Sequence, residues 1–400
     1  MKRDVYKHEE RYKTWKTEAL ESGIDGLAKK NSDIIIKYVL DMEIGKNISN
    51  KNVKGARSFP RLNNLRQRMR QVVIMLQNRG IDDITAVCDD DLIRLFSDMR
   101  SGVLKTKSNE KYRTAGDYAK VFTAFWHWWM KSNRREGQKI EDITEELDKT
   151  MESGRFVFLT KEKLDEMLPY FDEDEQIVLL FTFDSLIRAP TELLSLRVKD
   201  IFEKENGTWV NVPAEISKTK FERRFNLLYS GNSVKEYLKR KKLNSEDYLF
   251  NFNHHSLTEK MHKVAKQLWG DAISDPTAGG KYSELSLYDL RHSGTIHLRL
   301  LASKNANISI DSIRQRAGWK DFKMLNYYTK FIGLDGSIDK NELLIQEDKS
   351  KLEKELDEVK LNNKQMANKF GQLLDLFKRH PEEMSKIAII EKEKLLEIFR

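Results

Sequence analysis

Residues that break helices are scarce along this chain. Its 400 residues include only six prolines and nineteen glycines. Proline lacks a backbone donor and glycine loses much conformational freedom on folding, so their scarcity predicts long uninterrupted helices. A chain of this length also exceeds what one hydrophobic core usually holds. The sequence therefore favours a mainly helical protein with two or three domains.

Composition excludes several other classes of protein. Charged residues make up 34% of the chain and hydrophobic residues 39%, which excludes a membrane protein, a collagen-like repeat and a largely disordered acidic chain. Residues 1–16 lack the apolar core of a signal peptide. The single cysteine, Cys88, excludes disulfide frameworks and cysteine-based zinc sites and suits a reducing cytoplasm. We expect Cys88 to be a small core residue.

Basic residues are concentrated in one part of the chain. The net charge of the whole chain is +8, but residues 51–135 alone hold 18 lysines and arginines against 8 aspartates and glutamates. Residues 343–400 hold 12 of each sign and are neutral. This localised surplus predicts a module that binds a polyanion such as nucleic acid.

Two amphipathic helices are predicted inside the basic segment. Residues 61–80 repeat apolar side chains every three or four positions, and residues 110–135 place aromatic side chains on one stripe, which indicates packing rather than base stacking. The basic side chains beside them can either face solvent or bind DNA phosphates without reading sequence. The residues expected to bind DNA are Arg61, Arg66, Arg68, Arg70, Lys105, Lys107, Lys111, Arg113, Lys131, Arg134 and Arg135.

The second half follows an acidic run, and we place a linker at residues 145–155. Helices are predicted at residues 161–171 and 174–190. Residues 209–229 carry β-branched and aromatic residues on both sides of the polar sequence SKTK, which predicts a small antiparallel hairpin. Helices return after Ser233. The predicted fold class is mainly α with a small antiparallel β-sheet, an α+β fold.

Six side chains of this half suit phosphoryl transfer without a metal ion. Two arginines can hold the charge that builds on phosphate oxygens, a lysine can protonate a leaving oxygen, and a tyrosine can attack phosphorus. Tyr288 and Arg291 are three residues apart, so one helix face can present both. The candidate catalytic residues are Arg188, Lys218, Tyr288, Arg291, Trp319 and Tyr328.

These residues carry a resemblance to a known family. Arg188 is followed by TELLSLRVKDI, Lys218 lies in SKTK, and Arg291 lies in YDLRHSG. The tryptophan of a Gly-Trp pair stands nine residues before Tyr328. In this order and spacing the motifs resemble those of tyrosine recombinases, the phage-type integrases, over about residues 155–332. The basic segment resembles, more loosely, the helical core-binding domain of that family.

The resemblance implies a role for each candidate. Arg188 and Arg291 would clamp the scissile phosphate, and Lys218 would be the general acid to the leaving 5′ oxygen. Trp319 would donate its indole N–H to a phosphate oxygen, and Tyr328 would form a 3′-phosphotyrosine link. No metal, ATP or other cofactor is implied, because the phosphotyrosine conserves the bond energy.

The chain departs from the family pattern at two positions. Arg188 precedes Glu192 by four residues where the family has three, so the loop, which contains Pro190, must absorb one more residue. Tyr288 stands where the family has histidine, and a phenol with a pKa of about 10 is a poorer proton shuttle than imidazole. Such substitutions are similar to those of archaeal members.

Several alternatives stay open at single positions. Tyr327 is a neighbouring candidate for the nucleophile, and Lys220 is the rival lysine of the hairpin. Arg291 could instead cap a helix, and Trp319 could be a buried core residue. His292 is interpreted as structural.

The last part of the chain carries a heptad repeat. Apolar residues follow a spacing of four and three over about four heptads, with Asn363 at one position and Pro381 beyond the end. This pattern predicts a coiled coil that helps protomers associate, and a helix packed on its own catalytic domain is the alternative. The apolar positions are Leu352, Leu356, Val359, Met366, Phe370, Leu373 and Phe377.

The sequence thus predicts an N-terminal helical arm at 1–50, a core-binding domain at 51–150, a catalytic domain at 151–340 and a coiled-coil tail at 341–400. We expect a cytoplasmic, nucleoid-associated, site-specific DNA recombinase that cuts and rejoins one strand of each duplex at a time. Its expected partners are double-stranded DNA and further copies of itself, two on each site and four in the synapse, with no membrane and no small-molecule substrate. A type IB-like topoisomerase and a DNA-binding protein that has lost catalysis are the alternatives.

Overall fold

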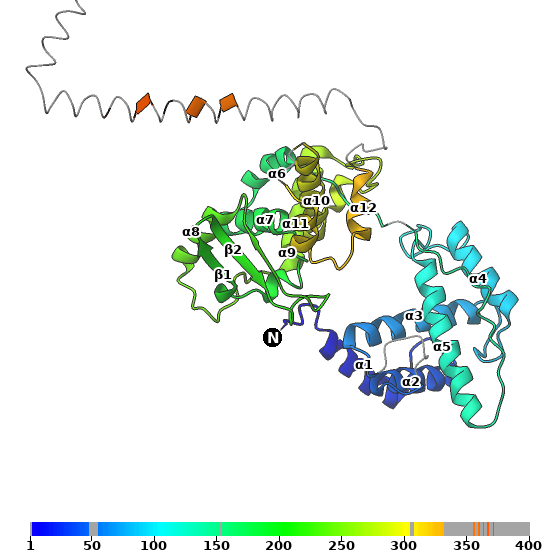
Figure 1. Ribbon diagram of the computed structural model, residues 1–400. Helices are drawn as coiled ribbons and strands as arrows, with labels where there is room; N and C mark the ends of the chain where they lie inside the picture. The colour runs from blue at the N-terminus through cyan, green and yellow to red at the C-terminus, as the bar shows by residue number, and fades with distance from the viewer. Residues whose placement is uncertain are drawn as a thin grey trace, which may run out of the picture. The chain divides into compact units, whose positions relative to one another are not determined.

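The computed structural model describes residues 2–47, 55–152, 154–304 and 308–331, with eight more between 355 and 371 (Figure 1). In these residues helices predominate and one three-stranded antiparallel sheet is present, which confirms the predicted fold class. None of the helices in the described ranges is long and apolar enough to cross a membrane.

The first five helices share one hydrophobic core, and in Figure 1 they gather in the blue-to-cyan part of the chain. The predicted helices at 61–80 and 110–135 are confirmed as α3 and α5. Helices α1 and α2 pack on α3, so the segment before residue 50 shares the core of the basic segment. The bounds are α1 His8–Ser22, α2 Lys29–Ile44, α3 Phe59–Gln77, α4 Asp89–Ser101 and α5 Ala115–Arg135.

Cys88 does not lie in the core, so that prediction was wrong. The residue is exposed and caps the start of α4. Its thiol and its backbone N–H both donate to the Asp91 carboxylate, at 3.1 and 3.3 Å. Three successive aspartates begin this helix, where negative charge is favourable, and they place the capping residue at the surface.

The sheet has the order β1-β2-β3, with β1 Ile201–Lys204, β2 Gly207–Val212 and β3 Arg223–Asn226. Along β2 the residues alternate between buried and half-buried positions, as expected for a strand with one face on the core. Val210 pairs with Phe225 and Val212 with Arg223, which confirms the predicted hairpin. Its long connection, residues 213–222, carries the sequence SKTK.

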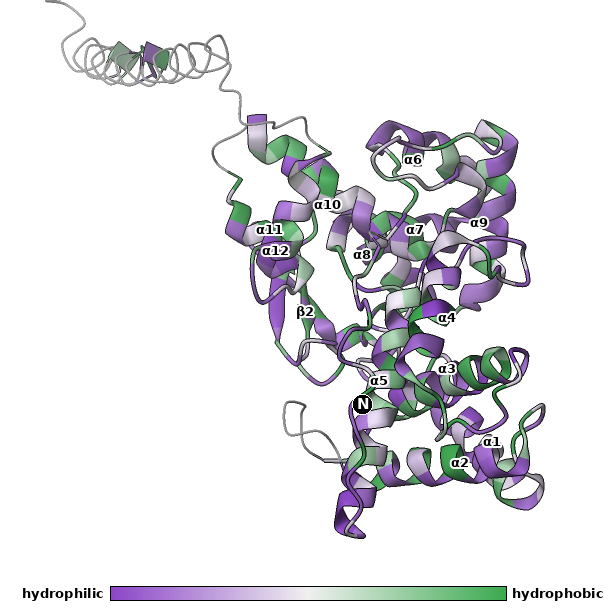
Figure 2. Cartoon of the chain, turned by 90° about the vertical axis from the view of Figure 1, so that its right-hand side faces the viewer, coloured by the Kyte–Doolittle hydropathy of each residue, from purple (hydrophilic) through white to green (hydrophobic). Residues whose placement is uncertain are grey.

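The remaining helices pack around the sheet and around α7, which is the most apolar of them. Residues 181–190, at the end of α7 and directly after it, are all buried. Helix α10 crosses α7 closely at Gly294, where a Cβ atom would lie 2.0 Å from the carbonyl oxygen of Phe183. In Figure 2 hydrophobic and hydrophilic residues share the same helices, as expected for elements with one buried face. The helices are α6 Lys161–Met167, α7 Glu173–Ser185, α8 Gly231–Lys241, α9 His254–Trp269, α10 Leu287–Lys304, α11 Ile310–Ala317 and α12 Lys323–Thr329, with 3-10 turns η1 Leu168–Tyr170, η2 Leu193–Ser195, η3 Val198–Asp200 and η4 Tyr282–Glu284.

Most of the predicted coiled coil lies outside the described residues. Of its apolar positions the structure describes Leu356, Val359 and Met366, which are helical and exposed, and Asn363 is helical as well. The coiled coil therefore stays a prediction.

Candidate active site

Two predicted arginines lie side by side against one turn of the backbone. Arg188 donates from Nη2 to the carbonyl oxygen of Gly318 at 3.2 Å, and Arg291 donates from Nη2 to that of Ala317 at 2.7 Å. Arg291 also donates to the carbonyl oxygen of Leu186. Only 8% of Arg188 and 1% of Arg291 is exposed. Burial and, after it, the charge of Arg188 lower the pKa of Arg291 to about 10.

A buried glutamate accompanies the arginines. Glu192 accepts from Nη1 of Arg188 at 2.8 Å and from Nη2 of Arg223 at 2.6 Å, and none of its side chain is exposed. Burial alone would raise the pKa of Glu192, but the charges of Arg223 and Arg188 outweigh burial and lower the pKa to about 2. Arg188, Arg223 and Arg291 carry three positive charges and Glu192 one negative charge, so this cluster retains a surplus of two.

The loop between Arg188 and Glu192 absorbs its extra residue as a tight turn. The backbone N–H of Glu192 donates to the carbonyl oxygen of Arg188 at 2.8 Å, and the Ala189–Pro190 peptide bond is cis. The carboxylate of Glu192 also accepts from the backbone N–H of Arg188 at 3.2 Å. The longer spacing therefore still brings the arginine and the glutamate together.

The connection between β2 and β3 is anchored beside this cluster. The backbone N–H of Lys218 donates to Glu192 at 3.1 Å, and the Thr219 hydroxyl donates to the carbonyl oxygen of Gly318 at 3.3 Å. The side chain of Lys218 is exposed, as is that of Lys220, which has a left-handed backbone conformation. The structure thus brings the Lys218 backbone to the arginines and leaves its side chain open to a ligand.

Trp319 packs between Arg291 and Tyr328. The guanidinium of Arg291 lies 5.4 Å from the centre of the indole, and the ring of Tyr328 stacks against Trp319 at 5.5 Å. Only 1% of Tyr328 is exposed. Burial raises the pKa of Tyr328, and the nearby charge of Arg291 lowers it to a smaller extent.

The hydroxyl of Tyr328 lies 2.5 Å from Nδ1 of His292, a residue that the sequence analysis interpreted as structural. His292 stacks on Phe156 with 4.5 Å between ring centres and forms a T-shaped contact with Tyr288 at 5.1 Å. Tyr288 itself is 41% exposed, so it is the most open member of the predicted set apart from Lys218. The rival nucleophile Tyr327 donates to the carbonyl oxygen of Gly154 at 3.4 Å.

The N-terminal segment brings a further lysine to the site. Arg3 donates from its backbone N–H to Ser195 Oγ at 3.1 Å and from its side chain to Asn251 at 3.3 Å. Lys2, next to this anchor, lies within electrostatic range of Glu192, Lys220, Arg188 and Lys218, and burial is the main cause that lowers its pKa. Nothing in the sequence pattern pointed to Lys2.

Residues 157–331 match the model of the phage integrase family, and this range holds all six predicted catalytic residues. The chain therefore contains a phage integrase family domain. As a tyrosine recombinase it is an enzyme that cuts and rejoins DNA strands at specific sites. No curated protein matches the chain by sequence.

Solved integrase structures share the fold of this chain. A lambda integrase dimer bound to a COC′ core site has a TM-score of 0.53 at 13% identity, over 83% of this chain and 88% of that one. A lambda integrase tetramer bound to a Holliday junction has a TM-score of 0.53 at 13% identity, over 80% of this chain and 81% of that one. The Tn1549 transposon integrase with circular intermediate DNA has a TM-score of 0.50 at 13% identity, over 79% of this chain and 98% of that one.

The basic residues expected to bind DNA divide into two groups. Three on α3 have partners within the chain: Arg66 donates to Asn63 at 2.8 Å, and Arg68 and Arg70 pair with aspartates at 3.0 Å. The loop between α4 and α5 holds four exposed cations, of which Lys111 pairs with Glu152 at 3.1 Å. The remaining loop cations are Lys105, Lys107 and Arg113, and Arg61, Arg134 and Arg135 are also exposed, whereas Lys131 is half-buried.

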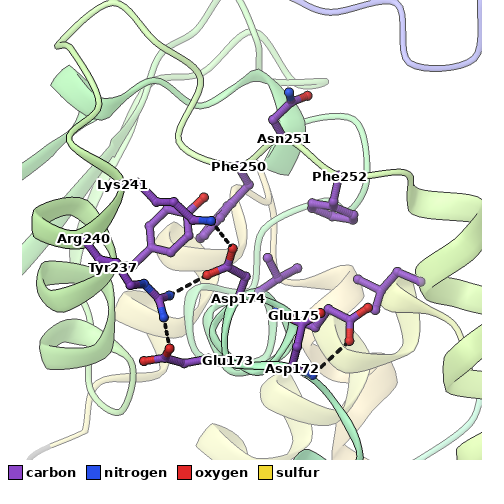
Figure 3. Close-up of a pocket in the computed structure, with 12 residues that line it drawn as sticks. Asp172, Glu173, Asp174, Glu175, Tyr237, Arg240, Lys241, Phe250, Asn251 and Phe252 are labelled. Atoms are coloured by element: carbon purple, nitrogen blue, oxygen red, sulfur yellow. Dashed lines mark hydrogen bonds and ion pairs between the residues drawn. The ribbon is translucent and has the colours of Figure 1, made fainter.

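The integrase domain also has a pocket of about 470 Å³ between the start of α7 and the end of α8 (Figure 3). Its charged groups pair with one another, since Asp174 accepts from Arg240 and from Lys241 at 2.5 Å each and Arg240 also contacts Glu173. None of the six predicted catalytic residues lines it. Within the described ranges no group of three or more histidine, cysteine, aspartate or glutamate side chains is arranged to hold a metal ion.

Proposed function

We propose that this recombinase breaks each DNA strand by attack of Tyr328 on a phosphate held between Arg188 and Arg291. The observation that carries the proposal is the buried charge cluster, whose two surplus positive charges suit the binding of an anion. A phosphodiester gains charge on its non-bridging oxygens during attack, and two guanidinium groups can hold that charge from fixed directions. Lys218, open beside the cluster, protonates the leaving 5′ oxygen.

Trp319 and Tyr288 have supporting roles in this proposal. Trp319 lies against Arg291 and Tyr328 and sets the distance between the clamp and the nucleophile. Tyr288 is open to solvent next to His292, where its hydroxyl can meet the DNA backbone. The exposed loop cations between α4 and α5 and the three exposed arginines of α3 and α5 bind flanking phosphates and position the duplex.

The expected assembly is a dimer on each site and a tetramer in the synapse, as in the lambda integrase complexes with DNA. In the cell such an enzyme would be found on the nucleoid. The exposed apolar residues Leu356, Val359 and Met366 support a role of the tail in association. Deletion of residues 343–400 should then leave strand cleavage intact and weaken assembly and strand exchange.

A covalent-capture assay tests the proposal. A pool of nicked duplexes with a randomised segment is incubated with the protein, and the DNA that becomes covalently attached is sequenced to define a substrate. Tyr328→Phe should abolish the adduct, whereas the Tyr327→Phe variant should still form it. No adduct would favour a binding protein without catalysis. An adduct with relaxation of supercoils but no exchange between sites would favour a topoisomerase.

A further inference from the structure

We propose that His292 is the general base that takes the proton of Tyr328 when this tyrosine attacks the scissile phosphate. The inference rests on the proposed function, in which Tyr328 is the nucleophile. Its starting point is the 2.5 Å contact between Nδ1 of His292 and the hydroxyl of Tyr328. In this motif Tyr288 occupies the position where the family has histidine. The imidazole of His292 lies one helical turn later, on the same face of α10.

The direction of the hydrogen bond follows from the protonation states. Burial, and after it the charge of Arg291, lowers the pKa of His292 to about 4, so the imidazole is neutral at pH 7. Burial raises the pKa of Tyr328, so the phenol keeps its proton. The phenol therefore donates and Nδ1 accepts, which places the imidazole hydrogen on Nε2.

Neighbouring rings hold the imidazole of His292 in this orientation, and a surface hollow beside it offers a route for a proton to solvent. Phe156 stacks on one face of the ring, and Tyr288 forms a T-shaped contact with it. His292 also lines a surface hollow of about 300 Å³. We infer that a proton taken at Nδ1 is balanced by release of the Nε2 proton into this hollow. The charged and titratable groups around the ring are Arg291, Tyr288 and Asp289 on α10, Tyr328 on α12, Arg155 before α6 and Glu284 in η4.

The complete step conserves protons and bonds. Nδ1 of His292 takes the phenolic proton, the Tyr328 oxygen bonds to phosphorus, and the bond from phosphorus to the 5′ oxygen breaks. The 5′ oxygen takes a proton from Lys218 and leaves as a hydroxyl. In the rejoining step a 5′ hydroxyl attacks, its proton returns to Lys218, and the departing phenolate regains a proton from His292.

Binding of DNA strengthens the base. A phosphate on Arg291 neutralises the charge that is the second cause of the low His292 pKa. The pKa of His292 therefore rises when substrate is bound, by the part that Arg291 causes and not by the larger part that burial causes, and proton transfer from the phenol becomes less unfavourable.

The test measures the rate of adduct formation on the captured duplex between about pH 6 and 9. Wild type should give a nearly flat profile, because the base is already neutral. His292→Gln should be about 100-fold slower at pH 7, and its rate should rise about tenfold per pH unit as phenolate accumulates. His297→Gln is the matched control, because His297 lies on the same helix but outside the cluster. Its Nε2 atom is 2.8 Å from the Tyr229 hydroxyl. It should react like wild type.

A second substrate separates the base from the acid. A 5′-bridging phosphorothiolate at the cleavage position has a leaving group that needs no proton, so it should rescue Lys218→Ala and leave His292→Gln slow. A slow His292→Gln enzyme with a flat pH profile, or rescue by the phosphorothiolate, would contradict a general base. A faster His292→Gln enzyme would mean that His292 restrains the tyrosine, which also overturns the inference.

Two controls keep these results interpretable. Thermal unfolding and DNA affinity of His292→Gln are compared with wild type, and His292→Asn, which keeps a polar atom near the Nδ1 position, serves if the glutamine variant does not fold. Failure of the proposed function would show differently, because Tyr328→Phe would then still form an adduct or wild type would form none.

Discussion

Arg223 and Glu192 form a fully buried ion pair, with 2.6 Å between Nη2 and Oε2. Arg223 lies on β3 and Glu192 follows the turn after α7, so the pair joins the sheet to the loop that carries Arg188. The pair places a negative charge inside the positive cluster, so the glutamate offsets part of the repulsion among the arginines.

Replacement of Glu192 by glutamine should reduce stability in a pH-dependent way. The folded-state pKa of about 2 lies below the ordinary value of 4.5, so the ionised carboxylate stabilises the fold above about pH 4.5 and loses this effect as the pH falls toward 2. Urea unfolding at pH 7 should show a loss of about 3 kcal/mol in Glu192→Gln. The difference from wild type should shrink between pH 4.5 and 2, and a difference that is constant over this range would contradict the assignment.

The close crossing of α7 and α10 predicts a strong effect at Gly294. A methyl group there would meet the Phe183 carbonyl oxygen at 2.0 Å, so the two helices would have to separate. Gly294→Ala should lower the free energy of unfolding by about 3 kcal/mol. Gly154→Ala is the control, since no atom lies within 4 Å of its Cβ position. Equal urea midpoints for the two variants would refute the packing argument.

The two groups of basic residues should respond differently to mutation. Lys107→Ala combined with Arg113→Ala should weaken DNA binding and reduce the slope of log affinity against log salt by about 2, because two exposed cations lose phosphate contacts. Arg68→Ala should keep the slope and cost about 1 kcal/mol of stability, because Arg68 pairs with Asp117. Fluorescence anisotropy across a salt series measures both slopes, and a larger slope change in Arg68→Ala would reverse the assignment.

Lys2 should contribute to phosphate binding at the arginine cluster around Glu192. Its ammonium lies within electrostatic range of Arg188 and Lys218, so a bound phosphate would be close to it as well. Lys2→Ala should weaken DNA binding about fivefold at low salt, an effect of about 1 kcal/mol. Lys7→Ala is the control on the same segment, because Lys7 pairs with Glu10 at 3.2 Å. Equal affinities of the two variants would exclude Lys2 from the interface.

The sequence was sufficient for the helices, the hairpin and the identity of the family. Helix and strand periodicity depend on residues a few positions apart, so α3, α5 and the pairing of β2 with β3 could be predicted from local patterns. The motif order from Arg188 to Tyr328 was also readable, because each motif is short and contiguous. Cys88 was misplaced because residue type alone does not distinguish a capping position from the core.

Only the tertiary structure decided which polar groups meet. Arg188 contacts the carbonyl oxygen of Gly318, which lies 130 residues later in the sequence. Arg223 and Glu192 are 31 residues apart in the sequence, and His292 and Tyr328 are 36 residues apart. A buried polar group takes its partner from whichever segment packs against it, and that packing depends on contacts distant in sequence. For the same reason the count of basic residues predicted a DNA-binding region but could not distinguish Arg68, which is paired within the chain, from Lys107, which faces solvent.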